Sequence, residues 1–546
     1  MDFCKLQTFA GVFGLAIVAG LAGAPQQAWA DNGLHNGPPE VTSAVKHDTL
    51  PSLRGVMPRP DDFAKSPHAH PLHLIPFISG SHRPGGGGGT GGDGAVQSSA
   101  FGSAPALGSS FDGVGQGFAG PQGIFTVNSA PPDTIGAVGT TQYVQVVNTG
   151  FAVWDKSTKS VIYGPVPTST LWAGFGGPCE NDNDGDATVV WDREAGRWVI
   201  SQFAVTAAPY YQCVAVSATA DATGAYYRYA FAYGNAFPDY PKMGVWPDAY
   251  YETFNIFNNG QTFAGAKLCA YDRNAMLNGA AATQQCFQLS TSYGGVLPAN
   301  VDSATLPPAG SPNYMLNFTS NQLNMWKFHV DWTNPANTSL TGPIAIPVAS
   351  FSAACGGGTC IPQVNTRQQL DSLGDRLMYR LAYRNFGDHE SLVVAQSVQV
   401  GTSRKNPYTG VRWYELRNLS AAQPTVYQQS SYAPDTNYRW MPSVAMDKLG
   451  DLAVGFSESS SAMYPAIRYA GRLATDALST LSAESSIMDG SGSQSGQNLS
   501  RWGDYSGMTV DPVDDCTFWY TNEYLKNTGA FNWSTRIGTF KFSTCQ

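Results

Sequence analysis

Charge and histidine are both scarce in this sequence. Charged residues make up 13% of the 546 residues, and the formal net charge is −9. An acidic chain lacks the basic surface that binds a phosphate backbone, so we expect no nucleic-acid partner. Only two of the eight histidines, His329 and His389, follow residue 100. They are too few for a three-histidine zinc site in that part of the chain.

Several familiar patterns are also missing. The sequence has no Cys-x-x-Cys pair, which argues against a zinc knuckle, and no Gly-x-Ser-x-Gly elbow of a serine hydrolase. Only one long apolar run occurs, from Phe9 to Ala24, and it is shorter than the roughly 20 residues that span a bilayer. We therefore expect no membrane span in the mature chain.

Residues 1–30 have the form of a secretory signal peptide. Lys5 precedes the apolar run, and Ala28-Trp29-Ala30 supplies the small-x-small pattern of a cleavage site. This pattern predicts cleavage after Ala30 and a protein that acts in the periplasm or outside the cell.

Eight cysteines remain once Cys4 has left with the signal peptide. An even set in an exported protein favours disulfides. Eight cysteines allow 105 pairings in principle, and the simplest choice joins neighbours in sequence. We predict the bonds Cys179–Cys213, Cys269–Cys286, Cys355–Cys360 and Cys516–Cys545.

Composition divides the mature chain in two. Residues 31–123 are rich in glycine, proline and histidine and show no strand or helix periodicity, which predicts a flexible leader or pro-segment. Within it, the tract 68–73 (HAHPLH) either binds a metal or is a solvated linker broken by proline, and we favour the linker. Residues 124–546 alternate short β-branched and aromatic runs with turn residues, as all-β domains do.

The all-β part repeats itself. An Asp- or Pro-containing turn followed by an apolar strand recurs at intervals of about 60 residues, and each copy leads into further strands. Seven such units fit the domain, which predicts a seven-bladed β-propeller with long loops. Six blades, or tandem β-sandwiches, are the alternatives.

Four motifs stand out in this domain: 131–139 (PPDTIGAVG), 185–187 (GDA), 439–447 (RWMPSVAMD) and 501–524 (RWGDYSGMTVDPVDDCTFWYTNEY). Through them the chain resembles a poorly characterised family of secreted bacterial β-propeller-like proteins over residues 125–546. The resemblance implies export and fold but no activity. More remotely the layout is similar to sialidase-like and arabinanase-like propellers, an analogy of fold alone. The Ser-x-Asp-x-Gly-x-Thr-Trp box of sialidases is absent.

A propeller gathers the starts of its inner strands around one channel mouth, where a site is expected. The repeat would bring catalytic acids and substrate-binding groups there: Asp133, Asp186 and Asp504, with Asp248, Arg376, Arg439, Trp440, Arg501 and Tyr505. Neighbouring carboxylates can raise one another's pKa and so supply the acid and base of glycoside chemistry. The alternative is structural, because an Asp that opens a strand often accepts backbone N–H bonds.

Two departures from the repeat suggest further chemistry. His389 lies between Asp388 and Glu390, so His389 and Glu390 are candidate general acid–base residues, or else His389 is an ordinary surface histidine. The loop 180–186 (ENDNDGD) spaces Asp182, Asp184 and Asp186 as Ca²⁺ ligands could be spaced, although Asx turns explain it equally. No organic cofactor is indicated.

Three functions remain open. The first is a secreted carbohydrate-active enzyme, a glycoside hydrolase or lyase that acts on a polysaccharide or other glycan at the acidic channel mouth. The second is a non-catalytic extracellular binding or adhesion propeller. The third is a hydrolase held latent by its Gly-rich pro-segment. We expect a monomer in each case.

Overall fold

The computed structural model describes residues 37–58, 67–70, 73, 75, 93–401 and 408–546. The predicted signal peptide lies outside them. Strands dominate, and the α-helices, α1 (Pro178–Asn181) and α2 (Arg273–Leu277), are single turns. The prediction of an all-β chain is therefore confirmed. No helix in the described part is long and apolar enough to cross a membrane.

The strands form antiparallel meanders. The first meander contains β9 (Ile135–Val138), β10 (Gln142–Val147), β11 (Gly150–Asp155) and β12 (Val161–Pro167). The second contains β13 (Thr188–Asp192), β14 (Arg197–Ala204), β15 (Tyr210–Ser217) and β16 (Tyr226–Gly234). The third contains β17 (Ala236–Val245), β18 (Tyr250–Asn258), β19 (Thr262–Tyr271) and β20 (Thr283–Gln288). The next two are β21 (Leu297–Val301), β22 (Asn313–Thr319), β23 (Gln322–His329) and β24 (Ser339–Pro347); β27 (Met378–Asn385), β28 (Glu390–Gln399), β29 (Thr409–Arg417) and β30 (Thr425–Tyr432). The last are β31 (Tyr438–Met446), β32 (Leu452–Ser460), β33 (Met463–Arg472) and β34 (Ser485–Met488); β35 (Gly507–Val510), β36 (Phe518–Leu525) and β37 (Trp533–Lys541).

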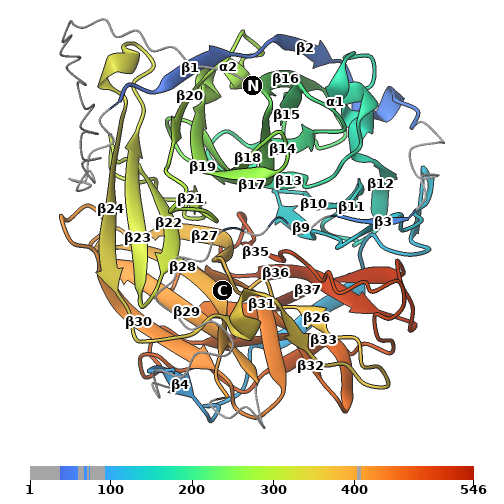
Figure 1. Ribbon diagram of the computed structural model, residues 1–546, viewed down its shortest axis with the longest axis vertical. Coiled ribbons are helices and arrows are strands. Elements are labelled where there is room, and N and C mark those ends of the chain that lie inside the picture. Colours follow the sequence, from blue (N-terminus) through green and yellow to red (C-terminus); the bar gives the residue numbers. More distant parts are fainter. Residues whose placement is uncertain (1–36, 59–66, 71–72, 74, 76–92, 402–407) are drawn as a thin grey trace, which may run out of the picture.

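The first strand of each meander lies at the centre of the molecule. β9 contacts β13, and the contacts continue through β17, β21, β27, β31 and β35 back to β9. β21 and β27 pair directly as parallel strands, which joins two meanders into one nine-stranded sheet. Figure 1 shows the sheets arranged around this centre. The inner strands β9, β13 and β31 are almost wholly buried, as strands covered on both faces must be.

A left-handed backbone conformation recurs where the chain enters an inner strand. Positive φ angles occur at Asp133 (50°), Asp186 (45°), Tyr240 (56°), Met441 (51°) and Asp504 (56°). Aspartate tolerates this region because its short side chain can hydrogen bond locally. The bulky residues at the equivalent places sit at bulges of β17 and β31. The repeat seen in the sequence is therefore a repeated turn that aims side chains at the centre.

The segment predicted as a flexible leader supplies strands instead. β1 (Glu40–Ser43), β2 (Lys46–Leu50), β4 (Val96–Gln97) and β5 (Ala106–Asp112) each add an outermost strand to a different meander. Their side chains are mostly exposed, so the sequence shows no alternation of apolar and polar residues. They are held by backbone N–H and C=O groups at open sheet edges, an interaction that composition does not reveal.

Short strands complete the fold: β3 (His68–Ala69) pairs in parallel with β8 (Ser129–Ala130), β6 (Ala119–Gly120) pairs with β7 (Gly123–Ile124), and β25 (Thr359–Ile361) pairs with β26 (Leu370–Asp371). The four predicted disulfides are confirmed in their predicted pairing: Cys179–Cys213, Cys269–Cys286, Cys355–Cys360 and Cys516–Cys545. Each closes a short loop, as expected where neighbours in sequence are also neighbours in a meander.

Candidate functional site

A polar cavity of about 40 Å³ lies where the inner strands begin. We call it the central cavity. It is lined by His70, His73, Asp186, Phe203, Phe237, Asp239, Tyr240, Arg376, Arg501 and Asp504. These residues come from several meanders and from the N-terminal segment, so only the closed arrangement of the inner strands brings them together.

Two buried aspartates, Asp133 and Asp186, lie beside each other at the site, and Asp186 lines the cavity. Asp133 and Asp186 precede β9 and β13, are almost fully buried, and hydrogen bond to each other through their carboxyl groups. Burial, followed by the like charges of Asp504 and Asp186, raises the pKa of Asp133 well above its usual range. Burial, followed by Asp239, raises the pKa of Asp186 to about 6. Two carboxyls in contact cannot both ionise easily, so the pair holds a proton near neutral pH.

Three cations balance the acids. Arg501 forms an ion pair with Asp504, three residues along the same turn. Arg376 pairs with Asp375 at 2.8 Å. Lys242 is fully buried, and burial lowers its pKa to about 8 against the opposing influence of Asp186.

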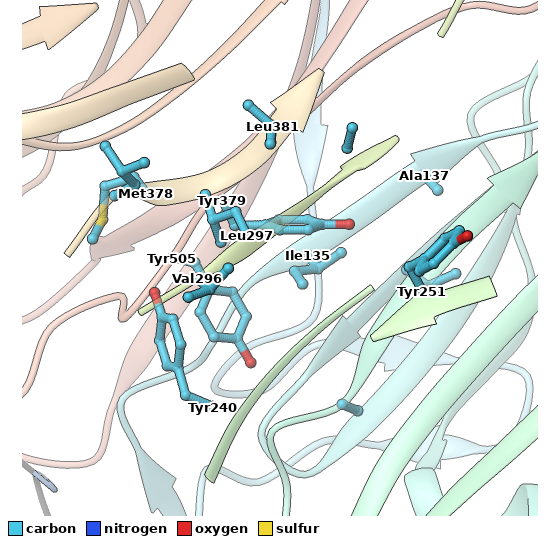
Figure 2. Close-up of a cluster of buried hydrophobic side chains, with 14 of the residues drawn as sticks. Ile135, Ala137, Tyr240, Tyr251, Val296, Leu297, Met378, Tyr379, Leu381 and Tyr505 are labelled. Carbon is cyan, nitrogen blue, oxygen red and sulfur yellow. The ribbon is translucent and has the colours of Figure 1, made fainter. Parts of the chain in front are cut away.

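Aromatic rings hold the lysine in place. The Lys242 ammonium lies 3.4 Å from the ring centre of Tyr240 and 3.8 Å from that of Tyr505. The two rings meet edge to face, with centroids 5.7 Å apart, and Figure 2 shows them side by side. Cation–π contacts of this kind gain strength when water is excluded.

Several buried polar atoms around the cavity have no hydrogen-bond partner in the described protein: Asp133 Oδ1, Tyr505 OH, Arg501 Nε and His70 Nε2. Buried polar groups are nearly always paired, and leaving one unpaired costs about 1–3 kcal/mol. Unpaired buried atoms also occur elsewhere in the described residues, but these four leave hydrogen-bonding capacity beside the cavity for polar groups of a ligand.

His70 and His73 were assigned to a linker by sequence, yet both line the cavity. Burial, with the nearby charges of His68 and Arg501, lowers the pKa of His70 to about 3. His73 Nδ1 lies 3.3 Å from Asp239 Oδ1, and this neighbouring carboxylate raises the pKa of His73. The close spacing of histidines in 68–73 was the sequence signal that this tract belongs to a site. The proline and glycine around it led instead to the prediction of a solvated linker.

Arg439 and Trp440, predicted to bind substrate, lie elsewhere. Arg439 is fully buried and is held by Asp435 (2.8 Å), Glu458 (2.8 Å) and Glu484 (2.7 Å); we call this group the Arg439 clamp. Every guanidinium nitrogen of Arg439 donates to one of these acids or to the Asn437 carbonyl. Trp440 is buried against Trp502, with ring centres 5.9 Å apart. Neither residue lines the central cavity.

Asp248, His389 and Glu390 lie beyond the opposite ends of inner strands. Asp248 follows β17, accepts a hydrogen bond from Tyr251 OH at 3.2 Å, and has its pKa raised to about 6 by burial. His389 occupies the turn between β27 and β28, where its Nδ1 lies 2.7 Å from Asp388. Glu390 accepts from Tyr383 at 2.5 Å. None of the three lines the central cavity. The cavity lies at the starts of the inner strands, and each of these residues comes after the end of its inner strand.

The loop proposed for calcium places its acids apart. Asp184 accepts from the Val205 amide (2.7 Å) and the Thr206 hydroxyl (2.9 Å), while Asp186 belongs to the central cavity. In the described residues, three carboxylates close enough to share one ion occur only at Asp435, Glu458 and Glu484. The Arg439 guanidinium already occupies that group. Calcium at 182–186 stays a prediction.

The central cavity therefore combines a protonated carboxyl pair, an ion-paired carboxylate, an amine and two histidines. Such a set can donate a proton at one point and accept one at another. Because Asp133 and Asp186 touch, no sugar fits between them, and glycoside chemistry needs a separation of about 5–9.5 Å. A working acid–base pair would have to combine one of them with Asp504.

Comparison with known proteins gives similarity of shape only. No protein-family model matches the chain, and no curated protein matches it in sequence. Solved structures similar to it include the polysaccharide lyase Uly1 (10% identity, TM-score 0.36, covering 80% of this chain and 98% of that one). Others are a xylan β-1,4-xylosidase from Bacillus halodurans (8%, TM-score 0.29, 76% and 96%) and an α-L-arabinofuranosidase from Lactobacillus brevis (13%, TM-score 0.27, 66% and 91%). At these values no activity transfers to this chain.

Proposed function

We propose that this protein is an exported, seven-bladed β-propeller that acts on carbohydrate at its central cavity, as a glycoside hydrolase or polysaccharide lyase. Seven inner strands contact one another in a closed circle, which supports the blade count. Four disulfides fit an oxidising compartment outside the cytoplasm. A glycan is the ligand we expect.

One observation carries the proposal: buried ionisable groups with unpaired polar atoms converge on one cavity at the starts of the inner strands. A neutral Asp133 or Asp186 would be the acid, and Asp504, positioned by Arg501, the base or nucleophile. Phe203 and Phe237 offer flat faces on which a sugar ring can stack. Polar groups around aromatic walls are typical of specific small-ligand sites.

A hydrolase and a lyase would use the site differently. A hydrolase needs the neutral acid to protonate a leaving oxygen. A lyase needs a base to remove a proton beside a uronate carboxylate, whose charge Arg376 or Arg501 would balance. The product distinguishes them, because only the lyase forms an unsaturated sugar.

The test is turnover on a panel of neutral arabinans and xylans and of uronic-acid polysaccharides, followed by reducing-end release and by ultraviolet absorbance of unsaturated products. Asp504→Asn should abolish turnover. Asp388→Asn, at an exposed turn, is the matched control and should leave turnover unchanged. Absence of turnover on every polymer, in the wild type and in the Ile75→Asp variant, would remove the enzymatic function.

Non-catalytic binding is the second candidate. The contact between Asp133 and Asp186 favours it, because two carboxyls that touch cannot flank a glycosidic bond. Glycan-array binding that survives Asp504→Asn, without turnover, would establish it.

A further inference from the structure

Described residues of the N-terminal segment lie at the central cavity, and two of them, His70 and His73, line it. β3 (His68–Ala69) pairs with β8, and the His70 amide donates to the Ala130 carbonyl at 2.8 Å. On the other side of the segment, Arg501 Nη1 donates to the His70 carbonyl oxygen at 2.8 Å. The backbone at His70 is thus held from both sides, once by a sheet edge and once by a cation of the site.

The side chains of the segment enter the site as a ligand would. The His73 ring lies 4.8 Å from the ring centre of Phe257 and 5.2 Å from that of Phe237, while its Nδ1 faces Asp239. The His73 ring meets Phe237 edge to face and lies tilted against Phe257, so it covers aromatic and acidic groups that a bound sugar could contact. His73 therefore occupies a place where substrate contacts are expected.

An apolar anchor follows. Ile75 is only 7% exposed and packs beside Gly294, where an added Cβ would lie 3.1 Å from Ile75 Cγ2. At Gly185 a Cβ would lie 3.1 Å from His70 Cε1, but Asn148 Oδ1 would lie closer, and the φ of 103° already favours glycine there. The close packing of the segment is therefore evident at Ile75 and Gly294.

The volume left beside the segment determines whether a glycan can enter the cavity while the segment is bound. With it in place the cavity measures about 40 Å³, far below the about 300–1,000 Å³ of typical ligand pockets. A sugar ring cannot enter beside it. The segment must leave before a glycan can reach Asp133, Asp186 or Asp504.

We propose that the segment containing residues 67–70, His73 and Ile75 is an autoinhibitory plug, an internal peptide that occupies the glycan site and competes with substrate until it is displaced. The proposal rests on the proposed function for the identity of the competitor, but occupancy of the site by the segment is testable by itself. A plug that is closed most of the time lowers the apparent affinity for glycan by the open fraction.

Ile75→Asp tests the plug, because a charge in the apolar anchor favours the released state. Ile124→Asp is the matched control, since Ile124 is 66% exposed. We expect Ile75→Asp to raise glycan binding or turnover by at least about tenfold, and Ile124→Asp to leave it unchanged. A synthetic peptide of sequence 67–75 added in trans should bind Ile75→Asp, compete with glycan, and fail to bind the wild type.

A second readout needs no glycan. The His70 imidazole, assigned by NMR with a His70→Gln variant, should not titrate between pH 5 and 8 in the wild type. In Ile75→Asp it should titrate near the ordinary histidine value of about 6.5. This readout reports release of the segment even if the panel contains no substrate.

The outcomes separate the two proposals. If His70 titrates and the peptide binds in trans but no glycan does, the plug stands and carbohydrate activity is overturned. If glycan turnover in Ile75→Asp equals or falls below wild type while His70 is released, the plug is overturned and the activity stands. If His70 stays protected in Ile75→Asp and the peptide never binds, the plug is likewise overturned.

Discussion

The central cavity and the Arg439 clamp are both buried groups of acids around a cation, but they differ in how completely the groups are paired. In the clamp, Arg439 donates from every nitrogen, and all three carboxylates receive it. In the central cavity, Asp133, Arg501 and Tyr505 each keep an unpaired buried atom. The saturated network of the clamp ties together strands of one meander, whereas an unsaturated one retains the capacity to bind. Pairing, more than charge, therefore separates a structural cluster from a candidate site.

After Asp504→Asn, Asp133→Asn should have the largest effect on function. The neutral amide keeps the shape of the carboxyl and tolerates the positive φ at this position, so the fold should keep its stability. Turnover should fall by about 10²–10⁴-fold, the usual contribution of a general acid or base. Kinetics on the active glycan measure this, with Asp435→Asn in the clamp as the matched control. Equal losses in both variants would erase the distinction between the two regions.

Arg439→Met should have the largest effect on stability. Removing the cation leaves Glu458 buried beside two other acids, with Arg468 as its remaining partner. Breaking a buried ion pair in this way costs about 3–5 kcal/mol. Urea unfolding should show this loss, while turnover per folded molecule stays near wild type. A loss of turnover without a loss of stability would show that the clamp takes part in function and is not only structural.

The pH dependence of stability should reveal the acids of the cavity. The folded-state pKa of Asp186 is raised to about 6 from 3.8, so the folded state binds this proton more tightly than the unfolded state. The contribution of Asp186 to stability is thus fully present below pH 4 and is lost as pH rises to about 6. Asp186→Asn should remove that loss. Between pH 4 and pH 7 the melting temperature should therefore fall less in the variant than in the wild type. Parallel curves of melting temperature against pH would contradict the prediction.

His389→Ala should have the smallest effect. The ring lies in a half-exposed turn, stacked on Phe386 and paired with the exposed Asp388. Surface substitutions of this kind usually change stability by no more than about 0.5 kcal/mol. Turnover should be unchanged. A loss of activity greater than tenfold would place a site at the opposite end of β27.

Much of this arrangement could be predicted from sequence. Alternating strands, the repeated turn and the even set of cysteines gave the all-β fold and the disulfide pairing. The repeat also brought Asp133, Asp186, Asp504, Arg376, Arg501 and Tyr505 to one place, because equivalent turns in a closed ring face the same centre. The repeat wrongly placed Asp248 and Arg439 at the central cavity. Asp248 comes after the end of its inner strand, and the side chain of Arg439 is held by the clamp acids instead. Lys242 and Asp239 had no distinguishing signal.

The sequence by itself determined which residues form strands, where the turns recur and which cysteines are neighbours, since these depend on local pattern. Only the tertiary structure decided that described parts of 31–123 supply edge strands and that His70 and His73 line the central cavity. Edge pairing uses backbone groups that every residue carries. The fit of His70, His73 and Ile75 depends on surfaces from distant blades, and no local pattern records it.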